Sequence, residues 1–314
     1  MILQFDVIGR CNNLDQHYGA FWALKGVCLE LQPGCTGLLG NNGAGKSTLI
    51  KTLLGQLPVQ PNRVELMGFD PAVNPLKVRQ RVGYMPEQEV YFPEMTGVEQ
   101  VAFCGQLSGM SRSDALARAH ESLDAVSFGE ARYRQVEGYS TGMRQRVKLA
   151  ACLVHGPGML FLDEPTSGLD PEGRDLMLAL IKDLAHGRGL SIVLSTHILQ
   201  DVEQTCDWLV ILSEGRVLYS GCRKEFQGDE RHVLQVRVKE KASSMAKLLQ
   251  EEGCTVEHRP GDPLLDVELP PGQDRSLIWK IAQNNDLQVR HLTSSAGSLS
   301  SAYARAVGER DNES

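Results

Sequence analysis

The residues whose chemistry is clearest lie at 40–48, where the chain reads GNNGAGKST. This nonapeptide fits the phosphate-binding pattern G-x-x-x-x-G-K-[ST], in which Lys46 contacts the outer phosphates and Ser47 ligates Mg²⁺. An apolar segment at 36–40 precedes it and a helix-like run at 47–57 follows it. The helix would therefore point its positive end at the same anion as the backbone N–H groups of the loop. The sequence predicts a nucleotide phosphate site made by nine consecutive residues: Gly40, Asn41, Asn42, Gly43, Ala44, Gly45, Lys46, Ser47 and Thr48.

Two adjacent carboxylates, Asp163 and Glu164, follow an apolar run at 159–162. A continuous apolar run of this length is typical of a central parallel strand, and ligands bind at the carboxyl ends of such strands. Asp163 would hold Mg²⁺ through water, and Glu164 would polarise the water that attacks the γ-phosphate. Taken alone, the pair could also be two acidic residues that cap a strand.

Three further motifs surround this strand. YSTGMRQRVKLA (139–150) precedes it, while SGLD (167–170) and SIVLSTH (191–197) follow it. With these motifs in this order, the chain resembles the ATP-binding subunit of an ABC transporter over roughly residues 1–225. The resemblance implies an α/β fold: a P-loop NTPase ABC ATPase domain with a RecA-like core, an antiparallel β subdomain, and an α-helical subdomain around residues 98–126.

The resemblance also implies roles for individual residues. YSTGM stands at the family's LSGGQ signature, which Ser140 and Gly142 match and from which Tyr139, Thr141 and Met143 depart. In this family the signature serves the nucleotide of the opposite subunit, so the resemblance implies a head-to-tail homodimer with ATP between the chains. The remaining matches are Asp170 of the D-loop, His197 as the switch histidine, and Tyr18 as the aromatic that stacks on adenine. Outside this context, His197 would read as a surface histidine and Tyr18 as a core aromatic.

Glu87 occupies the position at which the family has its Q-loop glutamine. That glutamine binds Mg²⁺ and the attacking water and links the nucleotide to the membrane partner. A glutamate can still ligate Mg²⁺ through oxygen, but it donates no hydrogen bond while ionised. Pro-Glu at this loop together with Y-S-x-G-M-R-Q-R resembles the branch that serves type-2 permeases, which includes drug exporters.

Residues 228–314 form a second predicted domain, after an ABC ATP-binding domain at 1–227. Strands predicted at 233–239, 254–259, 264–270 and 286–292 and helices at 243–253 and 275–285 give the order β-α-β-β-α-β, which is ferredoxin-like. A last helix is expected at 299–307. Cys254 stands alone, so copper delivery through C-x-x-C is not expected. A regulatory or dimer-supporting role and a solvated accessory role without a ligand both stay open.

Composition narrows the function classes. The 314 residues carry a net charge of −7 with a pI near 5.7, so nucleic acid is not the expected partner. Arg144, Arg146 and Lys148 are spaced by two along a helix, which favours a solvated surface over a nucleic-acid stripe. The eight cysteines form no C-x-x-C pair, and the start of the chain lacks the pattern of a signal peptide.

Two function classes remain. The first is the energising ATPase of an exporter, cytoplasmic and peripheral on the inner face of the cell membrane, which uses ATP and Mg²⁺ and partners an integral-membrane permease and a second copy of itself. The alternative is a soluble ABC ATPase that acts on nucleic acid or the ribosome without transport. The coiled-coil insertion of the DNA-repair members and the second cassette of the ribosome-acting members are both missing from this sequence, which favours the exporter.

Overall fold

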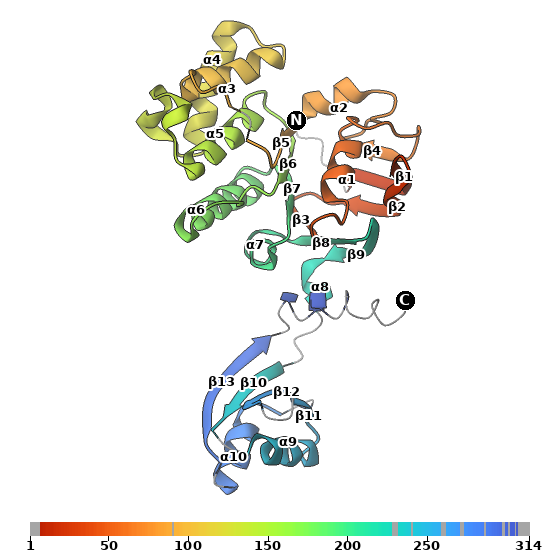
Figure 1. Cartoon of the computed structure of the whole chain (residues 1–314), viewed down its shortest axis with the longest axis vertical. Helices are drawn as coiled ribbons and strands as arrows, with labels where there is room; N and C mark the ends of the chain where they lie inside the picture. The colour runs from red at the N-terminus through yellow and green to blue at the C-terminus, as the bar shows by residue number, and fades with distance from the viewer. Residues whose placement is uncertain are drawn as a thin grey trace. The chain divides into compact units, whose positions relative to one another are not determined.

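The structure, a computed structural model, describes residues 7–89, 91–227, 232–239, 241–258, 262–270, 273–285, 287–296, 299–300, 302–304 and 306. The chain divides into two compact units, Met1–Arg223 and Lys224–Ser314 (Figure 1). Within the described residues no helix is both long and apolar enough to cross a bilayer.

A six-stranded sheet forms the centre of the first unit, in the order β5-β6-β7-β3-β8-β9. All neighbouring strands are parallel except β9, which runs antiparallel to β8. Every residue of β3, β6 and β7 is buried, as expected for parallel strands that are covered on both faces. The strands are β3 (Cys35–Leu39), β5 (Val82–Met85), β6 (Met159–Asp163), β7 (Ser191–Thr196), β8 (Trp208–Ser213) and β9 (Arg216–Cys222).

Helix α1 (Lys46–Leu53) starts at the end of the phosphate loop and is shorter than the run predicted at 47–57. The reason lies at Gly55, which has a φ of 63°. A Cβ atom there would lie 3.0 Å from the Pro71 carbonyl oxygen, so the chain leaves the helix where only glycine fits. Two more helices follow strands of the sheet: α6 (Pro171–Lys182), which continues into the π-helical turn Asp183–Gly187, and α7 (Leu199–Thr205).

A three-stranded antiparallel sheet in the order β2-β1-β4 packs its apolar side chains against helix α1. Its strands are β1 (Gly9–Tyr18), β2 (Phe21–Leu31) and β4 (Val64–Leu66). Leu24, Leu29 and Leu31 of β2 share one core with Leu49 and Ile50 of α1. This sheet is the predicted antiparallel β subdomain. The short helix α2 (Pro75–Arg81) leads from it to β5.

A helical group, which is the predicted α-helical subdomain, lies between β5 and β6 in the chain. It contains α3 (Gly97–Leu107), α4 (Arg112–Ala125) and α5 (Thr141–Leu153), with 3₁₀ turns at Gly129–Tyr133 and Val136–Gly138. Thr96 and Glu99 form a capping box at the start of α3, and the Ser111 side chain caps α4. The sequence predicts helical residues at 98–126 with an internal turn at 108–114, and the structure has α3 and α4 there with residues 108–111 between them.

The second unit has the element order β10 (His232–Val238), α9 (Ala242–Glu251), β11 (Thr255–His258), β12 (Leu264–Glu268), α10 (Ser276–Asn284) and β13 (Val289–Ala296). The sheet order is β11-β12-β10-β13, with antiparallel neighbours throughout. Val236 and Val267 of the sheet share a buried core with Leu249 and Ile278 of the two helices. Helix α8 (Arg223–Gln227) ends where the sequence predicts the domain boundary, and residues 228–231 lie outside the described part of the chain. The helix expected at 299–307 is only partly described.

Candidate nucleotide site

Three neighbouring strands of the central sheet position the site. The phosphate loop follows β3, Glu164 follows β6 and His197 follows β7, and these strands are adjacent in the order β6-β7-β3. Because the three strands are parallel, their carboxyl ends meet at one edge of the sheet. Motifs that are more than a hundred residues apart in the sequence are thus brought to one place.

The phosphate loop is tightly folded over its own lysine. The Lys46 ammonium donates a hydrogen bond to the Gly40 carbonyl oxygen (2.7 Å), and its side chain is buried. Gly45 has a φ of 107°, and a Cβ atom there would lie 2.8 Å from the Ala23 carbonyl oxygen. A Cβ at Gly40 would lie 2.4 Å from the Leu212 carbonyl oxygen. Both positions require glycine, which explains the spacing of the motif.

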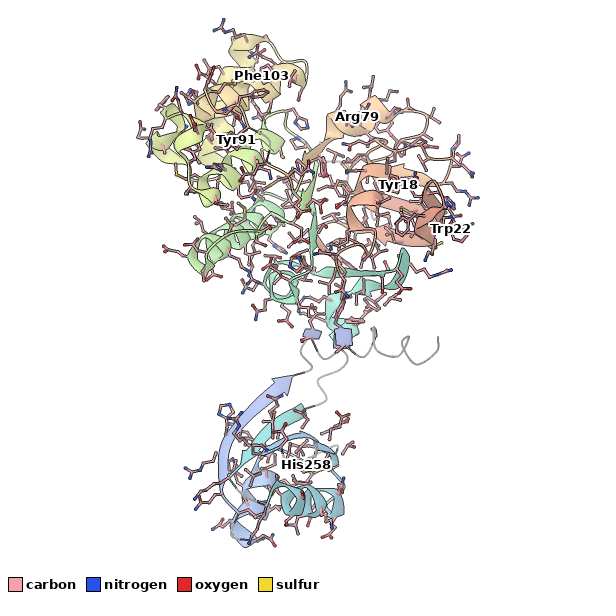
Figure 2. The ribbon with its side chains drawn as sticks, viewed as in Figure 1. Tyr18, Trp22, Arg79, Tyr91, Phe103 and His258 are labelled. Carbon is pink, nitrogen blue, oxygen red and sulfur yellow. The ribbon has the colours of Figure 1, made fainter. Side chains whose placement is uncertain are left out.

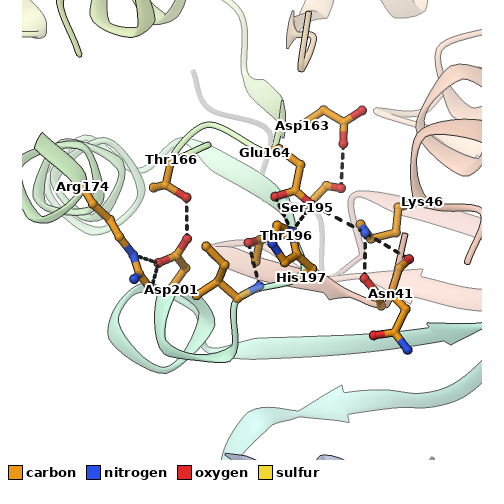
Figure 3. A network of polar contacts seen from close by, with 12 residues as sticks. Asn41, Lys46, Asp163, Glu164, Thr166, Arg174, Ser195, Thr196, His197 and Asp201 are labelled. Carbon is orange, nitrogen blue, oxygen red and sulfur yellow. Dashed lines mark hydrogen bonds and ion pairs between the residues drawn. The ribbon is translucent and has the colours of Figure 1, made fainter. Parts of the chain in front are cut away.

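The two carboxylates at the end of β6 have different surroundings. Asp163 accepts a hydrogen bond from the Ser195 hydroxyl (2.8 Å) on the neighbouring strand. Glu164 has a φ of 51°, in the left-handed region that non-glycine residues rarely occupy. Its side chain is 6 % exposed, with carboxylate oxygens 3.0 Å from His197 Nδ1 and 3.6 Å from Lys46 Nζ (Figure 3). Such backbone strain is common where a side chain must be held for function.

Lys46, Asp163 and Glu164 line a cavity of about 340 Å³, which lies in the range of small-molecule sites, whereas His197 contacts Glu164 but is not among the lining residues. Gly40 and Ala44 are buried under the loop, and Glu87 lines the cavity at the position of the Q-loop. The oxygen-bearing side chains of Ser47, Asp163 and Glu87 line the same cavity, which is the donor set that Mg²⁺ prefers. The lining residues are Phe21, Ala23, Asn41, Asn42, Gly43, Gly45, Lys46, Ser47, Thr48, Glu87, Asp163 and Glu164.

Tyr18 is not among the residues that line this cavity. It lies at the end of β1 and is 48 % exposed (Figure 2). The aromatic side chain in the lining is Phe21, at the start of β2, which is 63 % exposed. Sequence reasoning missed Phe21, although the stretch YGAFW holds three aromatic residues in the hairpin that faces the loop motif.

A second cavity, of about 430 Å³, collects the signature and D-loop motifs. Its lining includes Ser140, Gly142 and Asp170 together with Thr141 and Met143, which are two of the three departures from the family's motif. The side chains of Ser140 and Asp170 are the N-caps of α5 and α6, where they accept from the Met143 N–H (3.3 Å) and the Gly173 N–H (3.2 Å). Two helix starts thus meet at this cavity, and the start of α5, which has a neutral cap, is the one suited to an anion, because the Asp170 carboxylate already caps α6.

Basic side chains of α5 connect this signature region to the Q-loop. The buried Lys148 ammonium donates to the Glu87 carbonyl oxygen (3.2 Å), and burial lowers the pKa of Lys148. Arg144 pairs with Glu89 (3.2 Å) and lies over the Tyr91 ring. Arg146 lines the second cavity and donates to the Ser127 carbonyl oxygen. The expectation of a solvated helix surface is wrong for Lys148, which is buried, whereas Arg144 and Arg146 are partly exposed and each also contacts a neighbouring segment.

Comparison with known proteins agrees with this geometry. The ABC transporter family model matches residues 24–167. An uncharacterized ABC transporter ATP-binding protein, YxlF of Bacillus subtilis, is 33% identical over 298 residues, which are 94% of this chain and 98% of that protein. The daunorubicin/doxorubicin resistance ATP-binding protein DrrA of Streptomyces peucetius is 32% identical over 93% of this chain and 89% of its own length.

Among solved structures, cbiO1 of Clostridium perfringens, part of the ABC transporter complex cbiONQ, is similar with a TM-score of 0.64 and 28% identity. The match covers 70% of this chain and 90% of that one. The alignments with YxlF and DrrA cover more of the chain than the family model does and extend into its C-terminal unit. The chain belongs to the ABC transporter ATP-binding protein family, whose domain binds and hydrolyses ATP.

Proposed function

We propose that this chain powers an exporter: two copies close head to tail around two ATP molecules and drive a separate integral-membrane permease. The observation that carries the proposal is the division of the site into two cavities with no lining residue in common. One cavity holds the phosphate loop and the catalytic carboxylates, and the other holds the signature and the D-loop. Each cavity lacks the groups that the other supplies, so a second copy would complete both.

The contacts of Glu164 suggest how ATP would switch the site on. Lys46 and His197 both lie against this carboxylate. The γ-phosphate of ATP would attract the same two side chains, because each can donate a charge-assisted hydrogen bond to it. Glu164 would then be free to accept a proton from the attacking water. Mg²⁺, held through Ser47, Asp163 and Glu87, would neutralise charge on the phosphate oxygens.

Glu87 would serve the Q-loop role with altered chemistry. Its side chain lines the phosphate cavity, and its backbone oxygen accepts from Lys148 of the signature helix. Binding or release of a ligand at the Glu87 carboxylate would therefore change the position of Lys148 on α5. In the proposed complex the same loop would contact the permease, and the chain would lie on the inner, cytoplasmic face of the cell membrane.

The predicted stacking of Tyr18 on adenine can be tested by comparing ligands with and without a base. We expect Tyr18→Ala to weaken ATP binding about 5- to 150-fold, since stacking one base on an aromatic ring is worth roughly 1–3 kcal/mol. Inorganic triphosphate has no base, so calorimetry should show that it binds equally well to the wild type and to the Tyr18→Ala variant. Phe21→Ala is the matched variant, because Phe21 lines the cavity and Tyr18 does not. If only Phe21→Ala shows the base-dependent loss, the stacking residue is Phe21.

The function itself is tested by what the protein binds in gently solubilised membranes. A stoichiometric permease with many membrane helices is the expected partner, and the resistance protein DrrA among the relatives supports an exporter. Recovery of a ribosome or a DNA complex without a permease would favour the alternative, an ABC ATPase that acts on nucleic acid or ribosomes.

We also propose that residues 228–314 are a separate ferredoxin-like domain with a regulatory or dimer-supporting role. A chain that ends at Gln227 contains every residue that lines the two cavities, so it should bind ATP with an affinity close to that of the full chain. Its ATP-dependent dimerisation constant should change. Calorimetry and gel filtration measure these two quantities, and a large loss of ATP affinity would show that both the boundary and the division of roles are wrong.

A further inference from the structure

One carboxylate, that of Asp201 on α7, holds a polar cluster beside the nucleotide site (Figure 3). Its side chain is fully buried. The Thr166 hydroxyl donates to Oδ2 (2.6 Å), and Arg174 Nε donates to Oδ1 (2.7 Å). Arg174 Nη2 makes an ion-pair contact with the same Oδ1 (2.6 Å). A buried charge is tolerated only when it is paired and hydrogen-bonded in this way.

The two partners of Asp201 flank the D-loop, Ser167–Asp170. Thr166 is the residue directly before the loop, and Arg174 lies in the first turn of α6 directly after it. Thr166 is also two residues beyond Glu164. Both ends of the D-loop are therefore attached to a single carboxylate, and that carboxylate belongs to a different segment of the chain.

That segment begins at the switch histidine. His197 follows β7, its imidazole contacts Glu164, and α7 starts two residues later at Leu199. The Thr196 hydroxyl accepts from the Ile198 N–H (3.0 Å), which keeps the connection between the histidine and α7 tight. A displacement of His197 would thus be passed to Asp201 and from there to the D-loop.

The D-loop lies in the other cavity. Gly168, Leu169 and Asp170 line the cavity that contains Ser140, whereas Glu164 lines the cavity of the phosphate loop. The contacts of Asp201 thus attach helix α7, which follows His197, to both ends of the loop that lines the other cavity. Neither Asp201 nor Thr166 lines either cavity, so neither would contact nucleotide.

We infer that Asp201 is a positioning residue that couples the two ATP sites of the closed dimer. Its contacts with Thr166 and Arg174 fix the position of the D-loop relative to His197. Binding or hydrolysis of ATP in one chain, which moves His197, would therefore move the D-loop that this chain presents to the ATP bound by the partner. The inference rests on the proposed head-to-tail function. It predicts cooperativity between the two sites that depends on one hydroxyl–carboxylate contact.

Thr166 gives the cleanest test, because Thr166→Val removes only the donor and Thr166→Ser keeps it. For Thr166→Val we expect kcat to fall by about 10- to 100-fold, the cost of a small misplacement near the reacting groups. The KM for ATP should stay within about twofold, because the contact acts after nucleotide binding. The Hill coefficient for ATP should fall toward one. Thr166→Ser should retain the kcat and the Hill coefficient of the wild type.

Asp201→Asn should give the same pattern as Thr166→Val, and the double variant should be no worse than either single one. Asp124→Asn is the matched control, because Asp124 also pairs with a buried arginine, Arg132, in the helical group away from both cavities. It should leave kcat and the Hill coefficient unchanged. Melting temperatures of all variants separate loss of folding from loss of positioning.

Two results would overturn the inference. In the first, Thr166→Val hydrolyses ATP with the kcat and Hill coefficient of the wild type. In the second, Thr166→Val and Thr166→Ser lose activity together with stability, as a purely structural contact would. The proposed function is checked separately with the Glu164→Gln chain. If that chain stays monomeric with ATP, the sandwich and the coupling are both wrong; if it dimerises and Thr166→Val behaves as wild type, only the coupling is wrong.

Discussion

The Glu164→Gln chain is expected to bind ATP normally and to lose about 10²–10⁴-fold of its turnover, the usual contribution of a general base. Glutamine keeps the size and shape of the buried side chain, so the left-handed backbone at this residue and its contact with His197 can persist. What is lost is the charge and the ability to accept a proton from water.

The same substitution should stabilise the ATP-bound dimer. An ionised carboxylate beside the γ-phosphate repels it, and the amide does not. Gel filtration should therefore show an ATP-dependent dimer that the wild type reaches only transiently, and a steady-state ATPase assay measures the lost turnover. Glu121→Gln is the control, since Glu121 is exposed on α4 and pairs with Arg118 outside both cavities. Turnover above about a third of the wild-type rate would be too high for the loss of a general base.

The chemistry of the phosphate loop could be predicted because its signal is local. Gly45 and Lys46 lie within one short stretch, and the positive φ of Gly45 and the hydrogen bond from Lys46 to the Gly40 carbonyl oxygen are both formed inside it. The buried strands of the central sheet were predictable for a related reason. A parallel strand covered on both faces is apolar throughout, and this property is visible in the sequence of β6.

The contacts between segments could not be predicted in the same way. The pairing of Glu164 with Lys46 and His197, and that of Asp201 with Thr166, depend on which strands are neighbours and on their register. Spacing along one helix also misleads, as Lys148 shows. The spacing predicts that Lys148 is solvated, but its ammonium donates to the carbonyl oxygen of Glu87 in the Q-loop, sixty-one residues earlier in the chain.

The Ser140→Arg chain is expected to bind ATP as a monomer with an affinity within about twofold of the wild type, and to fail to dimerise or hydrolyse ATP. Ser140 is exposed and lines the cavity of the signature, away from the phosphate loop of its own chain. Arginine there would fill that cavity and remove the side-chain cap of α5, at a cost of about 1 kcal/mol in helix stability. In the proposed dimer only the nucleotide of the partner would meet the new side chain.

Lys46→Ala should give the opposite result. The buried ammonium that would contact the phosphates is removed, and hydrogen bonds to charged groups contribute about 1.5–3 kcal/mol, so ATP binding should weaken about 10- to 150-fold. The signature cavity of this chain stays intact, because Lys46 does not line it. The two variants thus damage different halves of the site.

Mixing the two variants gives the sharpest result. A dimer of one Ser140→Arg chain and one Lys46→Ala chain has one composite site with both defects, and one that combines an intact phosphate loop with an intact signature. The mixture should therefore form ATP-dependent heterodimers, in the Glu164→Gln background, although neither variant dimerises alone. If the mixture stays monomeric, or if Ser140→Arg abolishes ATP binding by the isolated chain, the two cavities do not belong to one shared site. Calorimetry of each variant and gel filtration of the mixture decide between these outcomes, because the half-sites complement each other only if ATP lies between two chains.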